Sequence, residues 1–127
     1  MKFRRQETFR YQFENPVNCL FRILKVDSKE LTSKIGKAYV NDISEGGIKI
    51  SSPLSIPLEN KVIEIELTFK LNQEDLVLTG TLAWRKDNFN NQYSYGVQFT
   101  IDESLKKQLI QELKIYTKGI ALIKKKK

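Results

Sequence analysis

The pattern of apolar and polar positions has a period of two over most of the chain. Its clearest run lies between residues 62 and 71, where every odd position is apolar: Ile63, Ile65, Leu67, Phe69 and Leu71. Such alternation predicts a strand with one buried face and one solvent-exposed face. Weaker forms of the pattern, separated by turn residues, cover residues 17–26, 37–43, 48–51, 76–84 and 93–99. We therefore predict about six short strands that form an antiparallel sandwich or small barrel.

The period changes near the C-terminal end of the sequence. Thr100 and Glu103 have the spacing of a capping box, in which both side chains satisfy backbone amides at a helix start. Apolar residues then recur at helical spacing: Leu105, Leu109, Ile110, Leu113 and Tyr116. We predict a helix of roughly four turns that packs on the barrel and ends near Gly119.

Composition removes several kinds of chemistry. Cys19 is the only cysteine and the chain has no histidine, which excludes an internal disulfide, the usual zinc ligand sets and a Ser-His-Asp triad. An enzyme is therefore not expected. Cys19 is interpreted as a small buried residue and Trp84, on the apolar face of the 76–84 pattern, as a core residue. The sequence shows neither a signal peptide nor a membrane span, which favours the cytoplasm.

The net charge of +7 is concentrated at the two ends. Residues 1–10 carry four basic side chains and one acidic one, and Lys124–Lys127 add four more basic side chains. Residues 11–123 then hold 14 basic and 14 acidic side chains and are neutral. A barrel that binds nucleic acid would spread basic residues along a face, so a small anionic ligand is favoured over RNA or DNA. The lysine run is interpreted as a solubilising tail.

Two segments have residue types suited to binding a nucleotide. The first carries Arg4, Arg5 and Arg10, whose guanidinium groups can bind phosphate oxygens or the O6 and N7 edge of guanine, or stack on a base. The second runs from Asp42 to Gly47 and includes Ser44 and Gly46. There a carboxylate and a hydroxyl can contact a base edge, and the glycines allow positive φ and close backbone approach. Taken singly, a solvated basic terminus and an ordinary turn would explain them.

Together, in this order, the two segments resemble the PilZ family of cyclic di-GMP receptors. Asp42–Gly47 matches the family's (Asp/Asn)-x-Ser-x-x-Gly motif, and the stretches Gly80–Arg85 and Tyr95–Phe99 are similar to its closing strands. The resemblance covers roughly residues 4–115. It implies a mainly β fold, a six-stranded antiparallel PilZ-like barrel with a C-terminal α-helix. It also implies an organisation into a flexible arm (1–12), a barrel with its helix (13–118) and a basic tail (119–127).

The resemblance further implies a non-catalytic receptor that needs no cofactor other than its ligand, cyclic di-GMP. The expected ligand-binding residues are Arg4, Arg5, Arg10, Asp42, Ser44, Gly46 and Gly47. The arm would close over the ligand, present as one molecule or an intercalated pair, and create a face for a downstream protein. The family's first motif is Arg-x-x-x-Arg, and this chain departs from it because Gln6 stands four residues before Arg10, where the first arginine is expected. We expect Arg5 or Arg4 to take that place. A nucleic-acid-binding barrel and a nucleotide-free adaptor are the alternatives.

Overall fold

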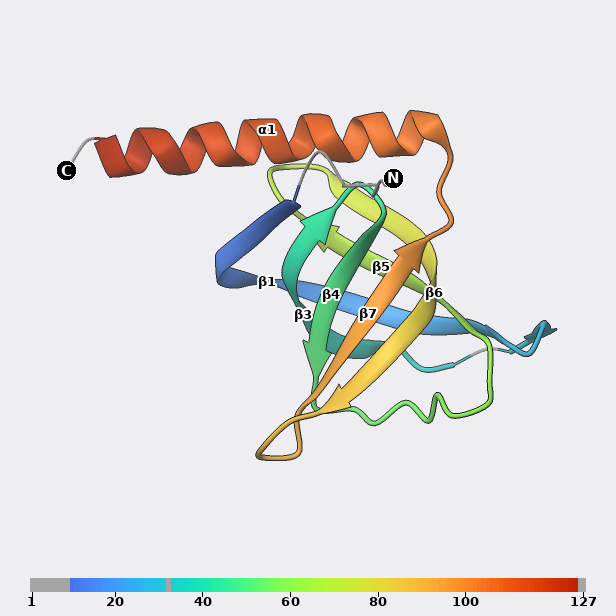
Figure 1. Ribbon diagram of the computed structural model, residues 1–127. Helices are drawn as coiled ribbons and strands as arrows, with labels where there is room; N and C mark the ends of the chain where they lie inside the picture. Colours follow the sequence, from blue (N-terminus) through green and yellow to red (C-terminus); the bar gives the residue numbers. More distant parts are fainter. Residues whose placement is uncertain (1–9, 32, 126–127) are drawn as a thin grey trace, which may run out of the picture.

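The structure is a computed structural model that describes residues 10–31 and 33–125, with side chains up to Ile120. Figure 1 shows a closed barrel of strands with one long helix across an end. The elements are β1 (Arg10–Val26), β2 (Lys29–Glu30), β3 (Gly36–Ser44), β4 (Gly47–Ser52), β5 (Ile63–Lys70), β6 (Asp75–Asp87), β7 (Tyr93–Phe99) and α1 (Glu103–Lys125).

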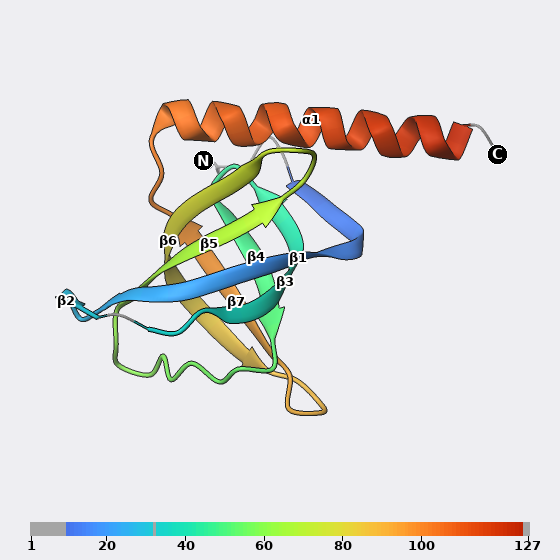
Figure 2. The same cartoon turned by 180° about the vertical axis from the view of Figure 1, so that it is seen from behind.

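All strand pairs are antiparallel. The order in the sheet is β2-β1-β3-β4-β7-β6-β5, and an additional pairing of β1 with β5 closes the barrel. Strand β1 can serve both neighbours because it is long and bends where its register with β3 shifts between Gln12 and Val17 (Figures 1 and 2). The two-residue strand β2 pairs with β1 alone. The predicted six-stranded antiparallel barrel is therefore confirmed.

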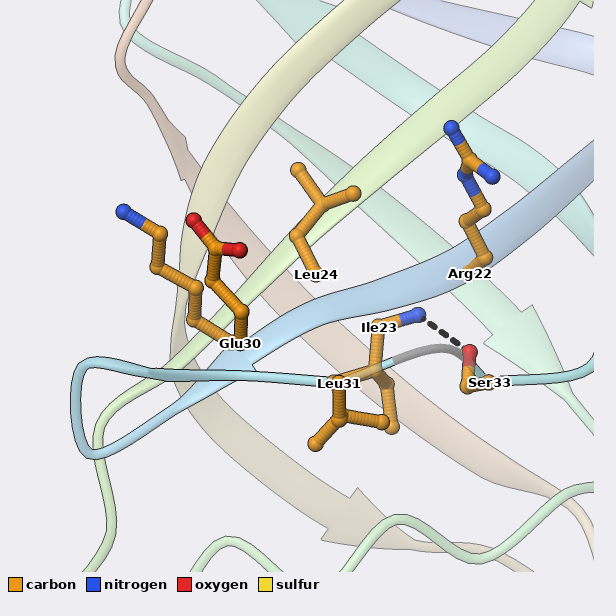
Figure 3. Close-up of a pocket in the computed structure, with 7 residues that line it drawn as sticks. Arg22, Ile23, Leu24, Glu30, Leu31 and Ser33 are labelled. Carbon is orange, nitrogen blue, oxygen red and sulfur yellow. Dashed lines mark hydrogen bonds between the residues drawn. The ribbon is translucent and has the colours of Figure 1, made fainter.

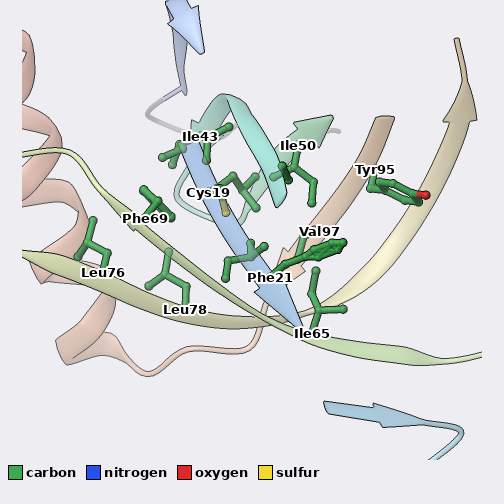
Figure 4. Close-up of a cluster of buried hydrophobic side chains, with 14 of the residues drawn as sticks. Cys19, Phe21, Ile43, Ile50, Ile65, Phe69, Leu76, Leu78, Tyr95 and Val97 are labelled. Carbon is green, nitrogen blue, oxygen red and sulfur yellow. The ribbon is translucent and has the colours of Figure 1, made fainter. Parts of the chain in front are cut away.

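The barrel interior is filled by the apolar faces of its strands (Figure 4). On β5, the predicted inward residues Ile63, Ile65, Leu67 and Phe69 are each at most 3% exposed, whereas Glu64 and its even-numbered neighbours face outward. Burial of apolar surface at roughly 25 cal/mol per Å² is the main term that stabilises such a core. The period-two pattern thus predicted this strand correctly.

Helix α1 lies across one end of the barrel, and in both views its C-terminal part extends beyond the strands (Figures 1 and 2). Leu109 and Leu113 are buried against the core. The ring of Tyr116 packs edge-on against Tyr11 and Phe13 of β1, with centroid distances of 6.1 and 5.4 Å. The start of β1 is therefore in contact with the helix. Among the described residues, no helix combines the length and the apolar character needed to cross a membrane.

Both predicted ends of the helix were wrong. Asp102 caps the start, since its Oδ1 accepts a hydrogen bond from the Leu105 amide at 2.8 Å. Thr100 instead shares a hydroxyl hydrogen bond of 3.2 Å with Thr79. At the other end the helix continues through Gly119 to Lys125, into the predicted tail. A glycine inside a helix costs only about 1 kcal/mol, and Lys118, Ala121 and Leu122 near this one are good helix formers.

Candidate functional site

A row of cross-strand neighbours runs across five strands on the outside of the barrel. Gln12 of β1 pairs with Asp42 of β3, which pairs with Lys49 of β4. Lys49 in turn pairs with Gly96 of β7, and Gly96 pairs with Trp84 of β6. We call these five residues the outer row. Because opposing Cα atoms in adjacent strands are about 5 Å apart, the row brings residues distant in sequence onto one surface.

A β-bulge turns Asp42 outward. In β3 the buried positions are Gly36, Ala38 and Val40, so strict alternation would also point Asp42 into the core. The pairing with β4 shifts register between Val40 and Asp42, and the next buried residue is Ile43. The extra residue reverses the phase of the strand. Asp42 therefore reaches the outer surface, where its side chain is 17% exposed.

A second bulge turns Trp84 outward, which corrects the prediction that Trp84 packs in the core. Leu82 is buried as predicted, but the pairing of β6 with β7 shifts register between Leu82 and Trp84. As a result Trp84 is 43% exposed. Its indole lies over Gly96, where even a methyl group would overlap the ring. The missing side chain of Gly96 thus makes a seat for the indole on the barrel wall.

Arg10, the first residue of β1, completes the site beside Asp42. Its Nη1 donates to Asp42 Oδ1 at 3.0 Å, and the arginine side chain is 63% exposed. This contact joins the two motifs that the sequence separates by 32 positions. The prediction that residues 10–12 belong to a flexible arm was wrong, because they are part of β1 and pair with β3. Arg4 and Arg5 lie outside the described residues.

The turn between β3 and β4, which contains the Asp42–Gly47 motif, is stabilised by contacts of its own residues. Ser44 is buried, and its hydroxyl donates to the Gly47 carbonyl at 3.4 Å. A Cβ on Gly47 would lie 2.5 Å from the Val97 carbonyl oxygen, so close approach to β7 requires glycine here. The expectation of positive φ was wrong, since no glycine in the described part of the chain has one. The Gly46 carbonyl accepts the Phe99 amide at 2.9 Å.

A pocket of about 360 Å³ lies over this surface, a size typical of small-molecule sites. Five of the sequence-predicted residues line it: Arg10, Asp42, Ser44, Gly46 and Gly47. Lys49, Trp84 and Gly96 also line it, although they are not among the ligand-binding residues expected from the sequence. A polar ion pair, a bare backbone floor and an aromatic wall therefore meet in one hollow.

A larger pocket of about 560 Å³ lies near the β1–β2 hairpin and contains no motif residue (Figure 3). Two of its polar side chains already have partners within the protein. Arg22 Nε donates to Glu66 at 2.9 Å, and the Ser33 hydroxyl accepts the Ile23 amide at 2.8 Å. We place the functional site at the pocket with the motif residues, which four of the five outer-row residues also line: Asp42, Lys49, Trp84 and Gly96.

The described residues offer no cluster of three or more histidine, cysteine, aspartate or glutamate side chains able to hold a metal ion. Cys19 is 3% exposed, and burial raises its pKa from 9.0 to about 12. A thiol so difficult to ionise is a poor nucleophile. The pocket itself offers charged groups, hydrogen-bonding groups and an exposed indole.

Comparison with known proteins agrees with this fold. The structure resembles the "PilZ domain with c-di-GMP of YcgR from Escherichia coli" with a TM-score of 0.64 and 16% identity, over 98% of this chain and 99% of that one. No curated protein matches the sequence closely enough to count as a relative. The PilZ domain family itself matches residues 4–114, which include both motifs and all strands. The chain therefore belongs to the PilZ domain family.

Proposed function

We propose that this chain is a non-catalytic receptor for cyclic di-GMP and that the ligand binds in the pocket over the outer row. One observation carries the proposal: the ion pair of 3.0 Å joins Arg10 to Asp42 in a pocket that is also lined by an exposed indole. The arginine and the carboxylate belong to the two motifs typical of the family. The YcgR domain with a similar fold was determined with cyclic di-GMP, which supports the same ligand here.

The ligand has two guanines and two phosphates, and the pocket has a group suited to each. The Asp42 carboxylate can accept hydrogen bonds from the guanine N1 and N2 donors. The guanidinium of Arg10 has five N–H donors, of which the ion pair with Asp42 uses one, so the others remain for phosphate or for the guanine O6 and N7 edge. The exposed face of Trp84 offers a stacking surface for a base, which contributes about 1–3 kcal/mol in comparable sites.

Ser44 takes a different part in this proposal from the two charged residues. Its hydroxyl already bonds within the turn, so it holds Asp42 and the glycine floor in place. A direct contact from Ser44 to the ligand stays a prediction. Arg4 and Arg5, ahead of β1, add cations that close over the phosphates, with Arg5 or Arg4 in the place left by Gln6.

We further infer that ligand binding is transmitted to a protein partner through α1. Ligand that orders the segment before β1 acts next to Tyr11, and Tyr11 contacts Tyr116 of the helix. The part of α1 that extends beyond the barrel is a suitable surface for that partner (Figure 1). Hydrogen exchange measured with and without cyclic di-GMP tests this route. Slower exchange in the first residues of β1 and in α1 supports it, and protection confined to residues 42–49 contradicts it.

Isothermal titration calorimetry with cyclic di-GMP, GTP and single-stranded RNA tests the function itself. We expect saturable binding of cyclic di-GMP that GTP and RNA do not match. An intercalated pair predicts two ligands per chain, and an affinity that falls with salt because several arginine contacts to phosphate are screened. Tight RNA binding with no cyclic di-GMP binding would refute the receptor and favour a nucleic-acid-binding barrel.

A further inference from the structure

Lys49 lies at the centre of the outer row. Its cross-strand neighbours are Asp42 on β3 and Gly96 on β7. Ile48 and Ile50, on either side of it in β4, are buried in the core. Alternation along the strand therefore points the Lys49 side chain to the outer surface, where it lines the pocket between the carboxylate and the indole. The first motif and the turn motif both leave this residue out.

Among the described charged residues that line the pocket, Lys49 is the cation whose charge is not balanced by an ion pair. Three of the described pocket-lining residues are charged: Arg10, Asp42 and Lys49. Arg10 and Asp42 neutralise each other through their 3.0 Å ion pair. The Lys49 side chain forms no hydrogen bond or ion pair with any other described residue, although Asp42 is its direct cross-strand neighbour. The described part of the pocket therefore carries a net charge of +1, and that charge is located on Lys49.

The position of Lys49 also limits which part of a nucleotide it can meet. Trp84 and Asp42 lie on β6 and β3, with Gly96 and Lys49 between them in the row. Lysine is a compact point charge without the planar fork that recognises a base edge in two places, so its best partner is a phosphate oxygen. The outer row thus has an aromatic group for the base at one end and a cation for the phosphate at its centre.

We propose that Lys49 is a phosphate-binding residue supplied by the barrel itself, in addition to the arginines of the first motif. The proposal rests on the proposed function, because it assigns a contact within the same site. Its physical basis is an unpaired ammonium group, half-buried on the wall of the pocket beside a neutralised ion pair. It implies that one of the positive charges that attract the ligand has a fixed position on strand β4.

The test is calorimetric titration of cyclic di-GMP into the native chain and three variants at low and at high salt. Lys49→Gln removes the charge and Lys49→Arg keeps it. Lys37→Gln is the matched control, since Lys37 is an exposed lysine of β3 that lines a different surface. We expect Lys49→Gln to bind roughly ten-fold or more weakly at low salt, Lys49→Arg to remain within a few-fold, and Lys37→Gln to match the native chain. The deficit of Lys49→Gln should shrink at high salt, because screening weakens the contact in the native chain.

Circular dichroism verifies that each variant is folded, and Lys49→Met offers a second removal of the charge that keeps the aliphatic stem. Native affinity in a folded Lys49→Gln or Lys49→Met variant overturns the inference and leaves the receptor intact. Equal losses in Lys49→Arg and Lys49→Gln also overturn it, because they would show that shape and not charge matters. A native chain that fails to bind cyclic di-GMP overturns the inference together with the proposed function.

Discussion

Gly96→Ala tests the seat on which the Trp84 indole rests. The added methyl group overlaps the indole ring, so the ring must move, and its exposed edge allows it to swing toward solvent. No described glycine has positive φ, so alanine introduces no backbone strain at this position. The variant therefore changes the position of one side chain while leaving the strand as it is.

The expected cost in stability is small. Trp84 is 43% exposed, so rather more than half of its surface is covered. If the swing uncovers about 50 Å² of apolar surface, the loss is about 1.2 kcal/mol at roughly 25 cal/mol per Å². Replacing glycine also restricts the unfolded chain, which returns about 0.4–1 kcal/mol. We expect the free energy of unfolding to fall by less than about 1 kcal/mol.

Fluorescence reads the displacement directly, because Trp84 is the only tryptophan in the chain. We expect a red-shifted emission maximum, faster quenching by acrylamide, and cyclic di-GMP affinity reduced several-fold through loss of the stacking surface. Gly119→Ala is the matched control, since a methyl group there meets nothing within 4 Å. Emission, quenching and affinity all equal to those of the native chain would refute the placement of the indole on Gly96 and its part in binding.

Three further predictions address the arginines and the cysteine. In calorimetry, Arg10→Ala should weaken cyclic di-GMP binding by about 1.5–3 kcal/mol, roughly ten- to hundred-fold. Its Tm should change little, because the exposed ion pair contributes about 1 kcal/mol or less to stability. Unchanged affinity would show that Arg10 is not part of the site. If Arg5 compensates for Gln6, Arg5→Ala should weaken binding severely and Gln6→Arg should change little, whereas a several-fold gain in Gln6→Arg would contradict compensation. Burial raises the Cys19 pKa to about 12, so the folded state keeps a proton that the unfolded state loses above its ordinary 9.0. The free energy of unfolding of the native chain, compared with that of Cys19→Ala, should therefore fall above pH 9 by up to about 1.4 kcal/mol per pH unit. Denaturant titrations measure it, and a constant difference between the two proteins across that range would contradict the raised pKa.

The sequence predicted the fold best where burial of apolar side chains alone determines the structure. On β5 each second residue is apolar over the whole strand, and all of the apolar residues face the core. The helix was predicted from its spacing, but its start was misplaced because Asp102 and Thr100 are both suitable caps. The choice between them depends on Thr79, which occupies the Thr100 hydroxyl from another strand. Such a tertiary partner leaves no local signal.

Within the site, the sequence predicted the residues whose chemistry is unusual for their segment. Arg10 and Asp42 were assigned to one ligand, and the structure places them 3.0 Å apart. Lys49 was missed because an isolated lysine between two apolar strand residues is typical of any exposed face. Its pairing with Asp42 supplies the missing information, and that pairing depends on the register between β3 and β4.

Trp84 shows why the hydrophobic pattern of the sequence did not predict the aromatic side of the pocket. Alternation from Leu76 to Leu82 assigns every even position of β6 to the core, and the four residues at positions 76, 78, 80 and 82 are buried accordingly. A bulge adds one residue to one strand of a pair, so it is recognised only by comparing that strand with its partner. The periodicity of the bulged strand alone therefore does not predict it. The bulges before Asp42 and Trp84 both fall at the outer row, and each turns an inward position outward. The pocket therefore exists because two strands break their alternation at the same level of the barrel, on either side of Lys49 and Gly96.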